Sequence, residues 1–110
     1  MAKLESVPLV TRLAEARRKV QLLSREIQEK TGVRGTQAQV LCALLDHGGV
    51  TQTHLVGVTN VDRSTLADVV RRLQRKGLVH RRRTKEDARA YAVRLTPAGE
   101  QLAKSIYKTM

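Results

Sequence analysis

The strongest constraint in this sequence is a change of hydrophobic period near its middle. Apolar residues in the stretch 63–76 recur at i, i+3, i+4 and i+7, as on one face of a helix: Leu66, Val69, Val70 and Leu73. After Gly77, a helix-stopping residue, the stretches 78–82 and 89–95 alternate apolar and polar side chains, as strands do. The pattern therefore predicts an amphipathic helix followed directly by a β-hairpin.

A shorter helix and a tight turn are predicted just before the amphipathic helix. Thr51 is a good N-cap for a short helix whose Leu55 and Val58 are expected to point inward. Asn60 suits the left-handed position of a tight turn, and Asp62 suits the N-cap of the next helix. This order is the helix-turn-helix motif, whose second helix can enter the major groove of duplex DNA.

Residues 8–30 are expected to form a long helix, with Pro8 in its first turn. Its apolar stripe consists of Leu9, Leu13, Ala16, Val20, Leu23 and Ile27. The stripe fits either packing within its own domain or an a/d seam between two copies, and the sequence leaves both open. A short C-terminal helix that carries Leu102 and Ile106 is the second candidate for a dimer interface.

Further local signals complete the expected layout. Thr36 to Gln39 has the form of a capping box, Val50 is expected to add a short strand, and Thr96-Pro97 starts the last helix. The 110 residues are expected to form one domain over 1–110, mainly α with a small β-hairpin wing, that is, a winged helix-turn-helix. Its parts are 8–30 as candidate dimerisation helix, 51–76 as helix-turn-helix, 78–95 as wing and 97–110 as C-terminal helix.

Positive charge is concentrated in the predicted recognition helix and wing. The formal net charge is +11, and residues 63–94 hold eleven Lys and Arg against three Asp and Glu. Such clustering is what contact with phosphates requires. Two Tyr, with no Phe or Trp, offer little for stacking single-stranded bases, so duplex DNA is the expected partner.

The candidate DNA-contacting residues lie on two elements. On the recognition helix they are Arg63, Ser64, Thr65, Asp68, Arg71 and Arg72. On the wing they are Arg82, Arg83, Lys85, Asp87 and Arg89. Arg63 could read guanine, whereas Asp68 either fixes a neighbouring arginine or accepts a hydrogen bond from cytosine. An arginine-rich hairpin tip suits a narrow minor groove, where a nearby carboxylate can orient the guanidinium.

The sequence resembles the MarR family of winged helix-turn-helix transcriptional regulators over about residues 34–104. The motifs that carry the resemblance are Val61-Asp62-Arg63-Ser64-Thr65-Leu66, Lys76-Gly77-Leu78-Val79, Glu86-Asp87-Ala88-Arg89 and Leu95-Thr96-Pro97-Ala98-Gly99. The resemblance implies a homodimer on a pseudo-palindromic operator, with Arg89 in the minor groove and held by Asp87. It implies a regulator that we expect to be a repressor. Family members normally have longer C-terminal helices, so residues 8–30 are expected to contribute to the dimer.

Several other classes are disfavoured by the sequence. No Gly-rich phosphate loop, metal-ligand spacing or nucleophile–histidine grouping is found, so neither an enzyme nor a metal or cofactor site is expected. Cys42 is interpreted as a small core residue, and no effector ligand is predicted. No apolar run could cross a membrane, and a cytoplasmic, nucleoid-associated protein is expected. The alternatives are a non-sequence-specific architectural DNA-binding protein and a winged-helix protein-interaction subunit.

Overall fold

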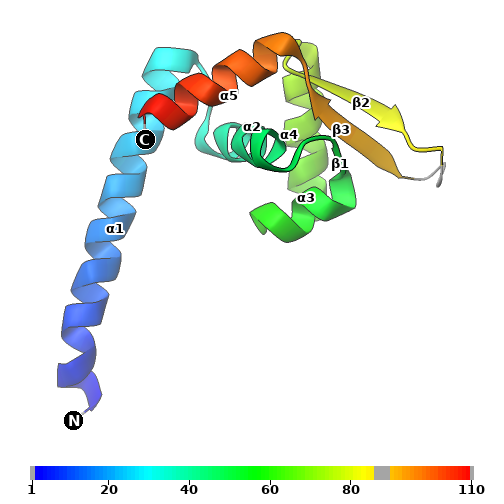
Figure 1. Cartoon of the computed structure of the whole chain (residues 1–110). Coiled ribbons are helices and arrows are strands. Elements are labelled where there is room, and N and C mark those ends of the chain that lie inside the picture. The colour runs from blue at the N-terminus through cyan, green and yellow to red at the C-terminus, as the bar shows by residue number, and fades with distance from the viewer. Residues whose placement is uncertain (1, 86–89, 110) are drawn as a thin grey trace.

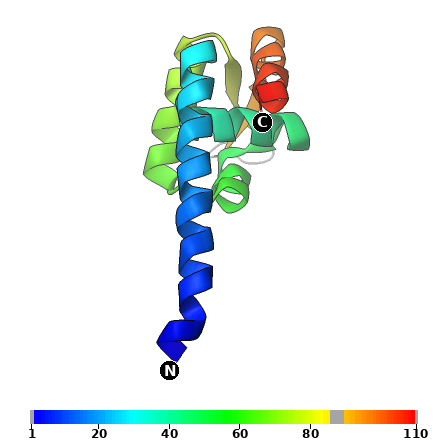
Figure 2. The same cartoon turned by 90° about the vertical axis from the view of Figure 1, so that its left-hand side faces the viewer.

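The computed structural model describes residues 2–85 and 90–109 and is mainly helical. The elements follow in the order α1 (Ala2–Thr31), α2 (Gly35–His47), β1 (Val50–Thr51), α3 (Gln52–Thr59), α4 (Arg63–Arg75), β2 (Val79–Arg83), β3 (Tyr91–Leu95) and α5 (Pro97–Thr109). Helix α1 leads away from a globular part as a long arm, and the wing projects from the opposite end (Figure 1, Figure 2). The predicted winged helix-turn-helix architecture is confirmed.

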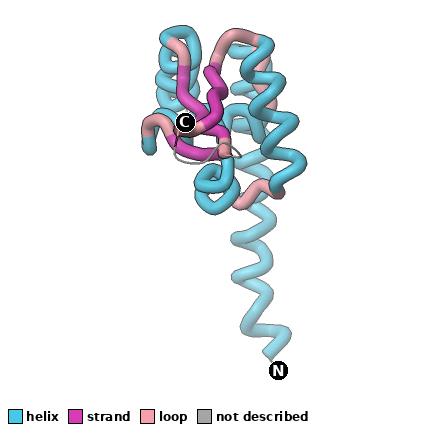
Figure 3. Tube along the Cα trace, turned by 90° about the vertical axis from the view of Figure 1, so that its right-hand side faces the viewer, coloured by secondary structure: helices cyan, strands magenta, loops and turns pink. Residues whose placement is uncertain are grey.

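Three antiparallel strands form a sheet in the order β1-β3-β2. Val50 pairs with Val93 and Val79 pairs with Leu95, so β1 closes the base of the hairpin, as predicted for Val50. Seen from the wing side, the strands lie in front of the helices and α1 lies behind them (Figure 3). The wing and the α1 arm are therefore at opposite ends of the molecule.

One apolar core joins the helices and the wing. Its fully buried large side chains are Leu41, Leu44, Leu55, Leu66, Leu73, Ile106, Val33, Val40, Val70, Val79 and Val93. The predicted inner face of α4 is among them, with Val69 also buried. Gly77 has a φ of 74°, and the Leu78 N–H donates to the Leu73 carbonyl oxygen at 2.9 Å, which ends α4 as predicted.

Helix α2 begins differently from the prediction. It starts at Gly35, its N-cap is Arg34, and no side chain caps it, so the capping box predicted at Thr36 is wrong. The Gln39 side-chain amide instead donates to the Thr59 carbonyl oxygen of α3 at 2.8 Å. The Gln39 side chain, which the sequence pattern assigned to the cap of α2, therefore binds a residue twenty positions away.

Two other expectations are corrected. Pro8 lies inside α1 and not in its first turn, because the helix already begins at Ala2; the proline ring fits the helical φ and costs one backbone hydrogen bond. Val58 is 41% exposed and does not point into the core. Leu55 and Thr59, one turn apart, take the buried side of α3.

We predict that Gly99→Ala destabilises the fold. A Cβ at Gly99 would lie 1.9 Å from the Leu78 carbonyl oxygen, so α5 must move away from the start of β2. Overpacking of this kind costs roughly 1–3 kcal/mol, and urea denaturation would measure the loss. Gly57→Ala is the matched control, since nothing lies within 4 Å of its added Cβ and a helical Gly→Ala change stabilises by roughly 0.5–1 kcal/mol. Equal stability of the two variants would contradict the prediction.

Asp62, the N-cap residue of α4, should make the stability of the fold depend on pH. The Asp62 carboxylate accepts from the Thr65 hydroxyl at 2.6 Å and from the Thr65 N–H at 3.1 Å, and these bonds lower the pKa of Asp62 below its usual 3.8. Because folding favours the carboxylate form of Asp62, this group makes its full contribution to the free energy of unfolding at pH values above its usual pKa. The contribution disappears as the pH falls through the lowered value.

We therefore expect Asp62→Asn to lower the urea midpoint at pH 7. Asn retains a capping oxygen but has no charge to interact with the helix dipole. The midpoints of variant and wild type should converge as the pH falls below about 4. A midpoint difference that stays constant over this range would show that the charge of Asp62 contributes nothing.

Candidate nucleic-acid interface

Hydrogen bonds hold the turn between α3 and α4. Asn60 has the predicted left-handed conformation, with a φ of 57°, and its N–H donates to the Val56 carbonyl oxygen at 3.0 Å. The Thr59 hydroxyl donates to the Leu55 carbonyl oxygen at 2.6 Å. The Thr59 carbonyl oxygen also accepts the Gln39 amide, which ties the turn to α2. These bonds fix where α4 begins.

The outer face of α4 carries the predicted contact residues. Exposed side chains from this set are Arg63, Ser64, Thr65, Arg71 and Arg72, and Asp68 is half-buried. The apolar face is buried against α2, α3 and β2. The helix therefore presents a row of arginines and short polar side chains to solvent, over a rigid support.

The hydroxyl of Thr65 already has a local role. It donates to Asp62, as the Thr65 backbone N–H does. A hydroxyl carries one proton, so in this conformation Thr65 offers an external group only an acceptor. The sequence motif alone treated Ser64 and Thr65 alike, whereas the structure distinguishes the cap partner from its neighbour.

Asp68 pairs with arginines of its own helix. Its carboxylate lies 3.1 Å from Nε of Arg72 and 4.0 Å from a terminal nitrogen of Arg71. All three side chains are about half exposed, and pairs of this type contribute only about 0.3–0.5 kcal/mol. The carboxylate thus orients the two guanidinium groups without removing them from solvent.

The wing arginines divide between two faces of the sheet. Arg81 and Arg83 share a face with Tyr91, and their Cζ atoms lie 4.3 and 5.7 Å from its ring centroid. Arg82 lies on the other face, where it lines a pocket of about 300 Å³ with Arg94. The predicted pair Arg82 and Arg83 therefore points in two directions. The alternation of side chains along β2 could have shown this split from the sequence. The contact of Tyr91 with these arginines could not be predicted without the register of β2 on β3.

The remaining wing residues complete the placement of the predicted set. Lys85 is exposed and lies in the loop two residues after the end of β2. Asp87 and Arg89 lie outside the described residues, so their predicted pairing stays a prediction.

Two basic grooves border α4, and sequence reasoning missed them. One, of about 240 Å³, runs between α4 and the start of α2 and includes Arg34, Thr36 and Arg72. The other, of about 460 Å³, adds Arg75 and Lys76 at the end of α4. The Lys76 ammonium donates to the Gln37 side-chain oxygen at 3.1 Å. Charge marks these residues in the sequence, but only the packing of α2 on α4 brings them together.

The predicted dimer stripe separates into an exposed and a buried part. Leu9, Leu13 and Val20 are 60%, 61% and 61% exposed. Leu23 and Leu102 are half-buried against the core. Ile27 and Ile106 are 5% and 1% exposed, because both pack inside their own chain. These last two residues have no surface left for a partner, which corrects their place in the predicted interface.

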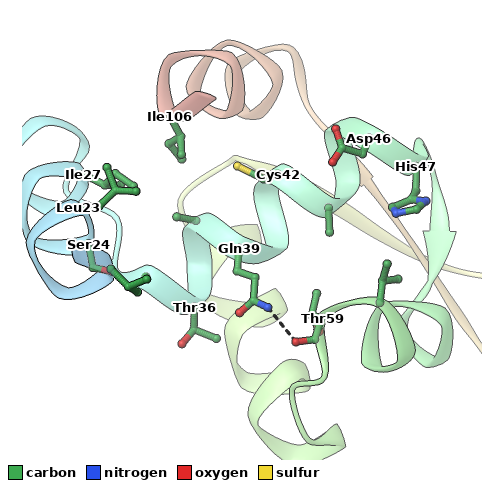
Figure 4. A pocket seen from close by; sticks show the side chains of 15 residues that line it. Leu23, Ser24, Ile27, Thr36, Gln39, Cys42, Asp46, His47, Thr59 and Ile106 are labelled. Carbon is green, nitrogen blue, oxygen red and sulfur yellow. Dashed lines mark hydrogen bonds between the residues drawn. The ribbon is translucent and has the colours of Figure 1, made fainter. Parts of the chain in front are cut away.

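A pocket of about 670 Å³ lies among α1, α2 and α5. Leu23 and Ile27 of α1, Cys42 of α2 and Ile106 of α5 surround it (Figure 4). Burial and the nearby Asp46 raise the pKa of the Cys42 thiol, which favours its protonated form. Cys42 packs against the core, as interpreted from the sequence.

Asp46 also joins α2 to α5. The Tyr107 hydroxyl donates to it at 2.5 Å, and this bond raises the pKa of Tyr107 to about 12.

Within residues 2–85 and 90–109, no cluster of three His, Cys, Asp or Glu side chains could hold a metal ion. Over the same part of the chain, no helix is long and apolar enough to cross a membrane.

Comparisons with known proteins agree with this geometry. The model of the MarR family matches residues 20–90. The transcriptional repressor NicR of Pseudomonas putida is 39% identical over 66 residues, which are 60% of this chain and 42% of NicR. The multiple antibiotic resistance protein MarR of Salmonella typhimurium is 28% identical over 104 residues, 94% of this chain and 72% of that protein.

Solved structures show the same similarity. Wild-type apo MarR from E. coli superposes with a TM-score of 0.84 at 26% identity, over 94% of this chain and 76% of that one. The chain spans less than half of the length of NicR, at 42%. The family match nevertheless covers well over half of the 110 residues. The chain therefore belongs to the MarR family.

Proposed function

We propose that this protein is a homodimeric transcriptional regulator that binds a specific duplex DNA site and represses by blocking a promoter. The observation that carries the proposal is the outer face of α4. A helix whose opposite face is fully buried holds Arg63, Arg71 and Arg72 outward, beside a basic wing. Major-groove insertion of such a helix is the standard use of the helix-turn-helix motif.

The relatives support the same reading. A cysteine-to-serine mutant of MarR from E. coli was solved in complex with operator DNA, and it matches this chain with a TM-score of 0.81 at 27% identity, over 96% of this chain and 75% of that one. NicR carries the name of a transcriptional repressor. No catalytic step is part of the proposal.

The residues divide into base-reading and phosphate-binding groups. We expect Arg63 and Ser64, at the start of α4, to read base edges, and a bidentate arginine contact with guanine contributes about 1–3 kcal/mol of discrimination. Arg71 and Arg72 bind phosphates, as do the wing residues Arg82, Arg83 and Lys85. Asp87 and Arg89 keep their expected minor-groove role. Arg34 and Arg75 extend the phosphate contacts along the basic grooves.

The dimer is proposed to form through the exposed part of the α1 stripe. Leu9, Leu13 and Val20 belong to α1 and remain largely exposed within the described part of the chain. An exposed apolar stripe at three- and four-residue spacing suits a helix seam between two copies. Leu23 of α1 and Leu102 of α5, both half-buried against the core, complete the proposed interface.

Specific binding would be tested by fluorescence anisotropy across a salt series. The duplexes are one from the upstream region of its own gene and one of scrambled sequence. We expect the wild type to prefer the former by about 10³-fold or more at physiological salt. Arg63→Ala should reduce this preference, whereas Arg12→Ala, on the distant α1 arm, should not.

Each of the other possible results supports a different function for this protein. Equal and strongly salt-dependent binding to both duplexes would favour the architectural alternative. Absence of binding to either duplex would favour the protein-interaction alternative. An unchanged preference in Arg63→Ala would remove the base-reading role of α4.

The dimer is tested by a charge placed in the stripe. Leu13→Lys should shift the sedimentation profile toward monomer, because a buried lysine without a partner opposes association. Thr11→Lys adds the same charge to the same helix, about half a turn away, and should leave the dimer intact. Point variants are preferable to removing residues 1–30, since Ile27 belongs to the core. A Leu13→Lys protein that remains dimeric would move the interface elsewhere.

A further inference from the structure

Two arginines of the wing meet on one aromatic ring. Arg83 is the direct cross-strand partner of Tyr91, and Arg81 is its diagonal neighbour on the same face. Their guanidinium carbons lie 5.7 and 4.3 Å from the ring centroid. Both distances are within the range of a cation–π contact. Tyr91 is one of only two tyrosines in a chain without Phe or Trp, so this ring has no aromatic neighbour in the wing.

The ring compensates a local repulsion. Two guanidinium groups on one short strand repel each other, and their flexible side chains would separate in solvent. The negative face of the ring attracts both cations and restricts their rotamers. A stacked guanidinium is planar and keeps its edge N–H groups free for bidentate contact with two oxygens of an anion such as phosphate. The arrangement therefore presents two oriented donor groups around one ring.

The position of the ring shows which side of the wing these groups serve. This face of the hairpin is apolar at its base, where Val79 and Val93 are buried, and becomes cationic toward its tip. Tyr91 also lines a small pocket of about 160 Å³ with Arg63 of α4 and Gln52 of α3. Arg81 and Arg83 thus share a face with the start of the recognition helix. Arg82 belongs to the opposite face.

We propose that Tyr91 is a positioning residue that assembles Arg81 and Arg83 into a clamp for the phosphodiester backbone of duplex DNA. The clamp would hold the DNA strand that passes between the start of α4 and the wing. The clamp adds Arg81 to the DNA-binding residues and makes the α4-facing side of the wing, not the Arg82 side, the main phosphate contact of β2. This inference rests on the proposed DNA-binding function.

The test is the salt dependence of duplex binding by the full chain. Each phosphate contact contributes about 0.9 to the slope of log K against log salt concentration. Arg81→Gln and Arg83→Gln should each lower the slope by about one. Arg94→Gln is the matched control, with the same change on the opposite face of the sheet, and should lower it by much less.

The role of the ring is tested by two substitutions at one position. Tyr91→Phe retains the aromatic face and should retain the wild-type slope, whereas Tyr91→Leu retains bulk but should lower the slope. In Tyr91→Leu, the further change Arg83→Gln should have less effect than in the wild type, because the clamp is already lost. A purely structural role would change the thermal midpoint of Tyr91→Leu and leave the slope unaltered.

Distinct results overturn the inference and the function. If the wild type binds duplex DNA but Arg81→Gln and Arg83→Gln keep its slope, the clamp is refuted and the proposed function stands. Equal losses in Arg81→Gln, Arg83→Gln and Arg94→Gln would refute the choice of face, whatever the Tyr91 variants do. A wild type that binds no duplex overturns the proposed function, and the clamp with it.

Discussion

Burial of one face of α4 is the interaction on which the arrangement of the candidate interface depends. Four apolar side chains lie inside the core: Leu66, Val69, Val70 and Leu73. Removing each from water stabilises the fold by roughly 1.5–3 kcal/mol, so rotation of α4 about its axis is strongly opposed. The arginines on the other face are held outward as a consequence. The same contacts with β2 set the base of the wing relative to α4.

Weak local contacts position the cations of α4 and the wing. Asp68 orients Arg72, the Tyr91 ring holds Arg81, and neutral Gln37 accepts from Lys76. Each of these contacts is short-ranged and partly exposed, and so each is weak. The side chains are positioned by them but remain available to phosphates. Self-repulsion among the cations is then relieved when a polyanion binds.

Helix α1 combines two environments along one stripe. From Leu23 onward the stripe faces α2 and α5, and Ile27 is a core residue. Before that point the same periodicity continues into the arm, where Leu13 is exposed. A regular heptad-like pattern records only that one face is apolar, and two different surfaces can satisfy it. Packing within the chain therefore accounts for the stripe from Leu23 onward, and the dimer seam over the exposed arm stays a proposal.

The sequence by itself determined the features that depend on neighbouring residues. The left-handed Asn60, the Asp62 cap and the buried face of α4 follow from local backbone energetics and period, and all were predicted correctly. Tertiary structure decided the rest. Gln39 pairs with Thr59 twenty positions away instead of capping α2, and the register of β2 on β3 put Tyr91 opposite Arg83. Local patterns carry no information on such choices, because they depend on which distant segments pack together.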